Sequence, residues 1–280
     1  MTRTNHDTLR LDFPVHLGAP ITEAVASPTA FCVLASSSSG NCSALIHGEG
    51  LLRRVTLIDC GLSPRRTRLL LARMGLDFSA IDDILVTHLD GDHFYSGWIK
   101  ALPRHTWLHI HARHLRRAAH AGVDMSRVTA FEDPFTLRCG VHVRPTVLSH
   151  DEWGVVAFRL DVRGVSLGYA TDLGRASASL IKAMQGVDVL AIESNYCRRM
   201  QVESDRPEQL KERIMGGFGH LSNEECAAAV RKIQPRDHVV LLHLSRQCNS
   251  PETAAAHHAG AGYRLTVADA EWPMAPIVLG

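Results

Sequence analysis

Short apolar runs recur along the chain and alternate with polar segments that carry helix signals. Runs of this length and composition predict strands. The predicted strands cover residues 31–35, 43–47, 55–59, 83–87, 141–148, 155–162, 165–170, 187–193 and 239–244. The Arg163-Gly164 pair between two of these runs is typical of a hairpin turn.

Several of the polar segments open with residues that favour a helix start. Ser63-Pro64 and Ser250-Pro251 place a capping hydroxyl before a proline, whose missing N–H costs nothing in the first helical turn. Ser222 and Glu225 have the spacing of a capping box. The predicted helices cover residues 63–75, 112–122, 176–184, 222–233 and 250–260.

The strands fall into two sets, each interleaved with helices. This order predicts an α+β fold with sheets covered by helices, a four-layer αββα sandwich. A doubly wound dinucleotide-binding fold is the competitor, but it requires a G-x-G-x-x-G motif after an early strand, and the sequence has none. Residues 1–29 are polar and irregular and are interpreted as an N-terminal extension. Residues 30–280 contain no linker and are expected to form a single domain.

Composition narrows the class of protein. The 280 residues are 45% apolar and 21% charged, with a formal net charge of +1. No run approaches the roughly 18 apolar residues of a membrane span, and the first thirty residues lack the pattern of a secretory signal. The seven cysteines include no C-x-x-C pair. Free thiols without an export signal indicate a cytoplasmic protein that does not bind membranes.

A polar cluster directly follows the strand predicted at 83–87. His88, Asp90, Asp92 and His93 place four potential metal ligands within six positions. The carboxylates at 90 and 92 repel each other. A divalent cation would offset that repulsion, whereas a surface loop would merely tolerate it.

Three later positions strengthen the metal interpretation. His150, Asp172 and His243 each follow a predicted strand. Strand ends on one edge of a sheet converge in space, so ligands that are distant in sequence can meet there. A single histidine at a strand end is usually structural, but three such sites beside the 88–93 cluster are hard to dismiss together.

The ordered set of His88, Asp90, Asp92, His93, His150, Asp172 and His243 resembles the metallo-β-lactamase superfamily, whose signature is H-x-H-x-D-H followed by a distant His, Asp and His. Finer features resemble its WalJ/YycJ-type branch. These are the segments 35–41 (ASSSSGN), 57–62 (LIDCGL), 193–195 (ESN), 219–223 (GHLSN) and 243–245 (HLS). The resemblance covers residues 31–268 and implies the metallo-β-lactamase fold and a metal-dependent hydrolase.

The resemblance also implies two divalent metal ions, with zinc first and manganese or iron as alternatives. His88, His150 and Asp90 would hold one ion, Asp92, His93 and His243 the other, and Asp172 would bridge both. A water between two such cations becomes a nucleophile near neutral pH. Asp90 departs from the signature, which has a histidine there. Asp90 is therefore either a ligand or a residue outside the ligand set, and a single-metal site is an alternative.

Further residues are candidates for catalysis and substrate binding. We expect Asp92 and His220 to act in catalysis, His220 as a proton donor or phosphate contact, with a structural cap as its alternative. Asn195, Ser39 and Asn41 are candidates for substrate binding, although plain loop roles are as plausible. Asp59 is expected to order nearby backbone or a ligand histidine rather than to bind a metal.

The remaining histidines and the arginine groups are expected to be structural or solvated. Twelve of the 17 histidines need no special role. Two short helices carry arginines that would form either solvated faces or a nucleic-acid track: Arg65, Arg66, Arg68, Arg113, Arg116 and Arg117.

The leading functional hypothesis is hydrolysis of a phosphodiester, either a nucleic-acid end or a small cyclic phosphodiester. The alternatives are a metallo-hydrolase of thioesters, lactones or β-lactams, and a non-catalytic binding protein with a degenerate metal site. Asp90 is the main support for the last alternative.

Overall fold

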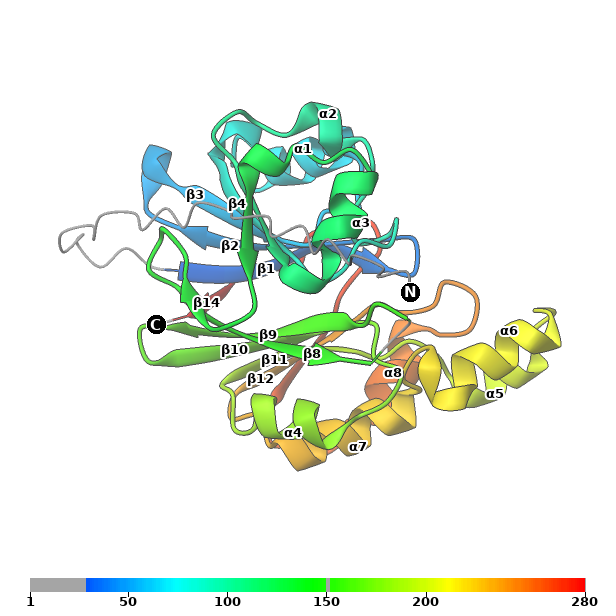
Figure 1. Cartoon of the computed structure of the whole chain (residues 1–280). Helices are drawn as coiled ribbons and strands as arrows, with labels where there is room; N and C mark the ends of the chain where they lie inside the picture. Colours follow the sequence, from blue (N-terminus) through cyan, green and yellow to red (C-terminus); the bar gives the residue numbers. More distant parts are fainter. Residues whose placement is uncertain (1–28, 150–151, 280) are drawn as a thin grey trace, which may run out of the picture.

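The structure is a computed structural model that describes residues 29–149 and 152–279. Within these residues two seven-stranded sheets pack face to face, and helices cover both outer faces (Figure 1). The four-layer αββα sandwich predicted from the order of elements is confirmed.

The first sheet has the strand order β14-β1-β2-β3-β4-β5-β6. β1 pairs antiparallel with both β14 and β2, whereas β3 to β6 run parallel to one another. The strands are β1 (Thr29–Ser37), β2 (Gly40–His47), β3 (Arg54–Ile58), β4 (Ile81–Val86), β5 (Trp107–His111), β6 (Val128–Phe131) and β14 (Ile277–Leu279).

The second sheet has the order β13-β12-β11-β10-β9-β8-β7. β10 to β13 run parallel, and β7, β8, β9 and β10 are antiparallel neighbours. The strands are β7 (Phe135–Thr136), β8 (His142–Leu148), β9 (Val155–Val162), β10 (Val165–Ala170), β11 (Val189–Glu193), β12 (His238–Leu242) and β13 (Arg264–Val267).

The helices divide between the two outer faces. α1 (Pro64–Arg73), α2 (Trp98–Ala101) and α3 (Leu115–His120) cover the first sheet, and α4 (Ala178–Met184), α7 (Asn223–Ile233) and α8 (Pro251–Ala256) cover the second (Figure 1). α5 (Arg198–Glu203) and α6 (Glu208–Arg213) project from one end, and a π turn (Ile214–Phe218) follows them. Short 3₁₀ turns are η1 (Gly50–Leu52), η2 (Phe78–Ala80), η3 (Ala112–His114) and η4 (Met125–Arg127).

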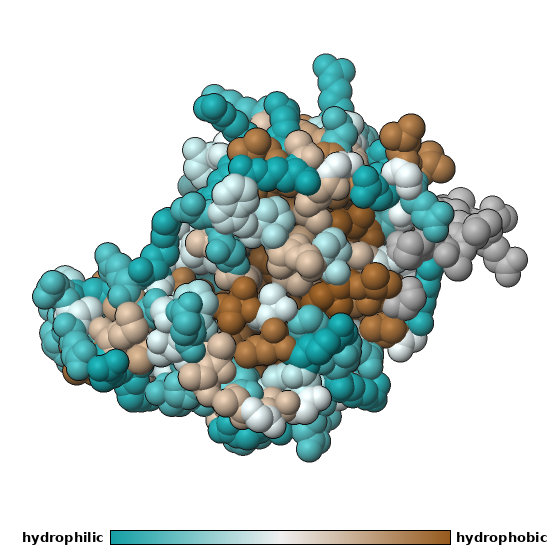
Figure 2. Space-filling model, turned by 180° about the vertical axis from the view of Figure 1, so that it is seen from behind, coloured by the Kyte–Doolittle hydropathy of each residue, from teal (hydrophilic) through white to brown (hydrophobic). Residues whose placement is uncertain are grey.

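Three apolar layers hold the sandwich together. The central layer lies between the sheets and contains Phe31, Phe158 and Tyr169. The two outer layers join each sheet to its helices, with Leu71 of α1 in one and Val230 of α7 in the other. Seen from behind, apolar residues reach the surface in a band across the middle of the molecule, with polar surface above and below (Figure 2). No helix in the described part of the chain has the length and hydropathy needed to cross a bilayer.

The local predictions hold best where a strong signal sets an element's ends. β9 and β10 have the predicted bounds, and Arg163 and Gly164 between them both have positive φ, as a tight hairpin requires. The capping box of Ser222 and Glu225 is formed. The helix predicted at 112–122 is wrong in detail, because η3 occupies its first turn and α3 is only six residues long.

Several elements carry too weak a sequence signal to be predicted. β6, β7, β13 and β14 are short, and all four lie at sheet edges. Such strands have few apolar residues to reveal them. The loop expected at the serine run is also shorter than predicted, because Ser36 and Ser37 belong to β1 and only Ser38 and Ser39 form the turn.

The carboxyl ends of the parallel strands meet at one edge of the sandwich. Asp59 follows β3, and Thr87 and His88 follow β4 in the first sheet. Asp172 follows β10 and His243 follows β12 in the second. This is where an α/β sheet brings distant residues together.

Close packing fixes the segment that carries Asp92 and His93. The backbone N–H of Asn41 donates to the Asp92 carbonyl at 2.8 Å, and that of Cys60 donates to the His93 carbonyl at 2.8 Å. Gly61 lies directly beneath, where an added Cβ would come 1.7 Å from the Asp92 carbonyl oxygen. Only glycine fits at this position without moving the segment.

We expect Gly61→Ala to destabilise the fold by about 1–3 kcal/mol, because the new methyl group overpacks a closed contact. Urea unfolding of the metal-free protein measures this. Gly91→Ala is the matched control, since a Cβ there meets no atom within 4 Å. Equal free energies of unfolding for the two variants would contradict the packing argument.

Candidate metal centre

Four predicted ligands converge at the common strand edge. Asp92, His93, Asp172 and His243 each offer one ligand atom, and these atoms all lie within 4.8 Å of one another. His93 Nε2 is 2.5 Å from Asp172 Oδ2, and His243 Nε2 is 3.2 Å from Asp92 Oδ2. Imidazole nitrogens and carboxylate oxygens are the ligands of zinc, and they also suit manganese or iron. The donor set therefore fits a divalent cation.

His88 adjoins this group from the end of β4. Its Nε2 lies 3.3 Å from Asp172 Oδ2, and its ring centroid is 4.3 Å from that of His93. Asp172 Oδ2 thus lies near both His88 and His93, while Asp172 Oδ1 lies 3.5 Å from His243 Nε2. A carboxylate in this position can face two cations, as the sequence analysis expected of Asp172.

Asp90 has a different environment from the other candidates. Its Oδ1 accepts a hydrogen bond of 2.6 Å from Nη2 of Arg117, which lies on α3. Its Oδ2 is 3.8 Å from His88 Nε2. The four-residue group does not include it. His150, the remaining predicted ligand, lies outside the described residues.

Buried polar residues orient the ligand histidines. His93 Nδ1 lies 2.7 Å from Asp59 Oδ2, which leaves Nε2 to face the cluster. The other oxygen of Asp59 accepts from the backbone N–H of Thr87 at 2.8 Å. Asp59 thus orders both the Thr87 backbone and the ring of His93, while the role of His93 as a ligand stays a prediction. Thr87 Oγ1 lies 3.0 Å from His88 Nδ1 and so orients that ring as well.

Two of the three residues predicted to bind substrate, Asn41 and Asn195, contact the ligand segments. Asn41 is buried, and its Nδ2 lies 3.0 Å from the Ser37 carbonyl oxygen and 3.1 Å from His93 Nε2. Asn195 is also buried and donates to the His243 carbonyl at 2.7 Å. Ser39 is exposed at the turn, and its backbone N–H donates to Ser37 Oγ. The hydrogen bonds of Asn41 and Asn195 are those of residues that hold the ligand segments in place.

His220 forms a pair with Glu193, which ends β11. His220 Nδ1 lies 2.7 Å from Glu193 Oε1 and 3.2 Å from Asp172 Oδ1. Glu193 Oε2 accepts from the backbone N–H of Leu173 at 2.6 Å. Glu193, Asp172, His220 and His243 also lie close enough to form a ligand group. Both oxygens of Glu193 are already engaged by protein donors, which favours an orienting role for it.

Strained backbone accompanies the site. Five non-glycine residues in the described part of the chain have positive φ, and three of them are Asp59, Asp172 and His243. This conformation costs about 1–3 kcal/mol per residue and persists only where the surroundings impose it. Because all three follow strands, the left-handed residue turns each side chain into the cluster.

The buried charges set the protonation of the metal-free site. Burial alone would raise the pKa of Asp172, but the imidazoles of His243 and His93 hold it well below its usual value. Burial lowers the pKa of His243, but the carboxylates of Asp172 and Glu193 outweigh it and raise that pKa to about 9. The same balance, with Glu193 as the main partner, raises the pKa of His220 to about 10. Both imidazoles are therefore protonated at neutral pH when no cation is bound.

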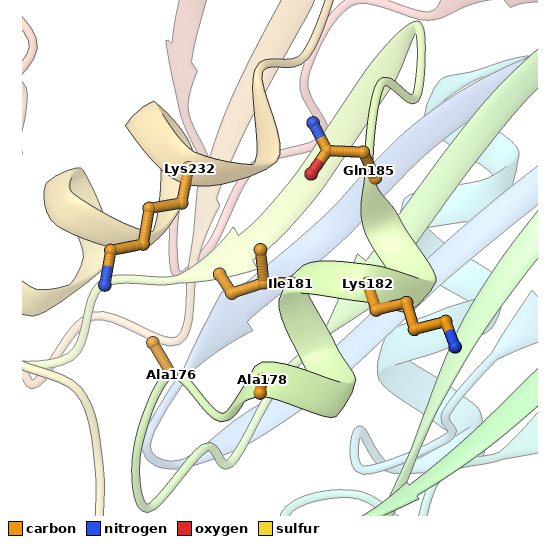
Figure 3. Close-up of a pocket in the computed structure, with 6 residues that line it drawn as sticks. All are labelled: Ala176, Ala178, Ile181, Lys182, Gln185 and Lys232. Carbon is orange, nitrogen blue, oxygen red and sulfur yellow. The ribbon is translucent and has the colours of Figure 1, made fainter.

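A cavity of about 200 Å³ opens onto the cluster. Its acidic side consists of Asp90, Asp92 and Asp172. The opposite side comes from the projecting helices and the segment after them, with Leu210, Arg213, Ile214, Gly219 and His220. A wider groove of about 650 Å³ between α4 and α7 is lined by Ala176, Ala178, Ile181, Lys182, Gln185 and Lys232 (Figure 3). That groove contains no imidazole or carboxylate, so the smaller cavity is the candidate site.

Sequence reasoning left three features of the site unassigned. It gave Glu193 no role of its own, although the residue ends an apolar strand as the other site residues do. It treated Arg117 only as one of a group of helix arginines. It did not predict the projecting helices that supply Leu210 and Arg213, because that segment has little apolar periodicity.

Comparison with known proteins agrees with this geometry. A family model described as a beta-lactamase superfamily domain matches residues 53–244. The exodeoxyribonuclease WalJ of Streptococcus pneumoniae is 30% identical over 233 residues, which cover 80% of this chain and 84% of that protein. The exodeoxyribonuclease YycJ of Bacillus anthracis is 28% identical over 232 residues, 80% of this chain and 85% of that protein.

Solved structures share the fold. The metallo-β-lactamase fold protein YhfI of Bacillus subtilis superposes with a TM-score of 0.64 at 15% sequence identity, covering 89% of this chain and all of that chain. The fold expected from the sequence resemblance is confirmed.

Zinc binding is expected to release about two protons per ion at pH 7, because His93 and His243 must lose theirs to coordinate a metal. Neighbouring carboxylates outweigh burial and raise the pKa of both imidazoles, that of His243 to about 9, so the apparent affinity should rise with pH from neutral and fall as the pH drops. Calorimetric titration in buffers of different ionisation enthalpy measures the protons released. His220→Gln is the control, because His220 pairs with Glu193 and is not among the four residues expected to coordinate this ion. Zinc binding with no proton release between pH 6 and 8 would contradict the assignment of these ligands.

Proposed function

The chain belongs to the beta-lactamase superfamily, and from that premise we propose that it is a metal-dependent hydrolase that cleaves phosphodiester bonds at the ends of DNA strands. The observation that carries the proposal is that the four-residue ligand group adjoins the His220–Glu193 pair, and that Asp92, Asp172 and His220 line one cavity. Relatives named as exodeoxyribonucleases support the choice of substrate.

Asp92, His93, Asp172 and His243 would hold one divalent cation, with zinc as the first choice and manganese or iron as alternatives. Such an ion supplies positive charge to the phosphoryl oxygens and makes a neighbouring water more acidic. A second cation would bind beside His88, Asp90 and the shared Asp172. His150 remains a predicted ligand of that second ion.

Asp92 and Asp172 would hold the cation that attracts the phosphoryl oxygens and the attacking water. Asp172 reaches His88, His93, His220 and His243 with its two oxygens, so it fixes the relative positions of the donors. The buried rings of His88, His93 and His243 exclude bulk water from one side of the cluster. This strengthens the electrostatic interactions within the site.

His220 donates the proton that the departing alkoxide needs. Its Nδ1 is held by Glu193, and this hydrogen bond orients the ring toward the cavity that it lines. Glu193 also stabilises the imidazolium form, so the proton is present at neutral pH. The pair therefore positions a charged acid next to Asp172.

The cavity favours the end of a DNA strand as substrate. Its modest volume suits one phosphodiester group together with part of a terminal nucleotide. Arg213 offers a cation to a neighbouring phosphate, and the half-exposed Leu210 offers an apolar contact to a base. The seven cysteines are all unpaired, which supports a reducing cytoplasmic compartment for the protein.

Zinc-loaded or manganese-loaded protein should release mononucleotides from labelled linear DNA and leave closed circular DNA intact. Gel and chromatographic analysis of the products, run in parallel with a small cyclic phosphodiester, measures this. Asp172→Asn should reduce the rate by at least about 100-fold, and asparagine tolerates the positive φ at this position. Cleavage of neither substrate by the metal-loaded protein would refute phosphodiester hydrolysis, and cleavage of the cyclic compound alone would refute a DNA end as substrate.

His220→Gln should slow DNA cleavage by about 10²–10⁴-fold, because the leaving alkoxide then lacks its acid. The same variant should lose far less activity on bis-p-nitrophenyl phosphate, whose leaving group needs no proton. The loss in kcat of the variant relative to wild type is measured on each substrate, and the zinc content should be unchanged. An equal loss on both substrates would assign His220 to phosphate binding or to folding.

A further inference from the structure

Asp90 stands where the superfamily signature has a histidine, and the structure gives it a partner that a histidine would not need. Arg117 Nη2 donates to Asp90 Oδ1 at 2.6 Å. The other carboxylate oxygen, Oδ2, lies on the side of His88, 3.8 Å from its Nε2. The two oxygens of Asp90 therefore face different groups.

The charge balance explains why such a partner is required. A neutral imidazole at position 90 adds no charge to the site, whereas a carboxylate adds one negative charge beside Asp92 and Asp172. The positive guanidinium of Arg117 cancels this added charge. The net charge then equals that of a site with a neutral histidine at position 90. Arginine keeps its charge at every pH relevant to proteins, so this compensation does not depend on conditions.

The Arg117–Asp90 pair also differs from an ordinary surface ion pair. The two side chains are only 32% and 35% exposed. Arg117 Nη1 is buried, with no hydrogen-bond partner among the described residues. The bond to Asp90 holds the Arg117 side chain in this partly buried position.

We propose that Asp90 and Arg117 act together as one charge-compensated ligand. Asp90 Oδ2 coordinates the cation beside His88 and Asp172, and Arg117 is the positioning residue that fixes Oδ1 and neutralises the added charge. The inference rests on the proposed function only in that it requires metal binding, and it concerns affinity rather than catalysis.

The proposal makes the two positions interdependent. Arg117→Gln leaves Asp90 uncompensated and free to rotate. Asp90→His, made alone, brings a neutral donor next to a guanidinium that now repels the cation. The double change Asp90→His/Arg117→Gln removes both the uncompensated carboxylate and the repelling guanidinium. It places the histidine of the signature in neutral surroundings.

Titration of the metal-free protein with zinc alone tests this. Wild-type protein should bind two zinc ions, the tighter one at the group of Asp92, His93, Asp172 and His243. Each single variant should weaken the second binding event by about 10–100-fold, the usual loss when an orienting partner of a ligand is removed. The double variant should recover wild-type affinity to within about threefold. Arg117→Lys should retain part of the affinity, because it keeps the charge and loses the planar geometry.

Arg116→Gln is the matched control, because it removes an exposed arginine from the adjacent position of the same helix. It should leave both binding events unchanged.

Three results would overturn the proposal. They are a single zinc per wild-type chain that Arg117→Gln does not affect, Asp90→His alone binding as tightly as wild type, or a raised KM in Arg117→Gln with zinc affinity unchanged. The last result would make Arg117 a phosphate contact. Failure of DNA cleavage in a protein that shows the expected zinc pattern would refute the proposed function and leave this inference standing.

Discussion

The pairing of buried carboxylates with imidazoles is the interaction on which the rest of the site depends. Asp59, Asp172 and Glu193 are almost completely removed from water, and an isolated carboxylate in such surroundings would be strongly unfavourable. Each of them faces a histidine: His93, His88 and His220 are among the partners. The same carboxylates raise the pKa of His93 and His220, so protons on those two rings balance the buried negative charge when no cation is bound.

Both sheets contribute to this network, and backbone geometry joins them. Asp59 and His93 come from the first sheet, whereas Asp172, Glu193 and His243 come from the second. The backbone N–H of His243 donates to Ser36 Oγ at 2.8 Å, which ties the end of β12 to β1. Positive φ at Asp59, Asp172 and His243 then turns the side chains inward. The strain is tolerated because burial and hydrogen bonding leave these residues no alternative conformation.

The sequence predicted the fold and the membership of the candidate site for reasons that can be stated residue by residue. Strong local signals, such as the Ser222 capping box and the Arg163-Gly164 turn, need no tertiary information. His88, Asp92, His93, Asp172 and His243 were recognisable because they follow strands and form an ordered signature. That these residues are brought together is a finding of the structure, and their role as ligands stays a prediction.

Other parts of the site depend on three-dimensional proximity that no local pattern reports. Arg117 lies 27 positions from Asp90 and belongs to a helix with other arginines, so nothing in the sequence separates it from a solvated residue. Asn41 and Asn195 were assigned to substrate from their place in loops, yet their amides are used by the backbone and by His93 and His243. Short edge strands such as β14 carry too few residues for their pattern to be seen.

The pairing of β14 with β1 has a consequence for how the chain folds during synthesis. β1 precedes the other described strands in the chain, but its outer neighbour β14 is made only after all seven strands of the second sheet. Until then one edge of β1 presents unpaired backbone groups, which is the type of surface that associates with other chains. Closure of the first sheet therefore waits for β14, and loss of residues 277–279 would leave that edge of β1 open.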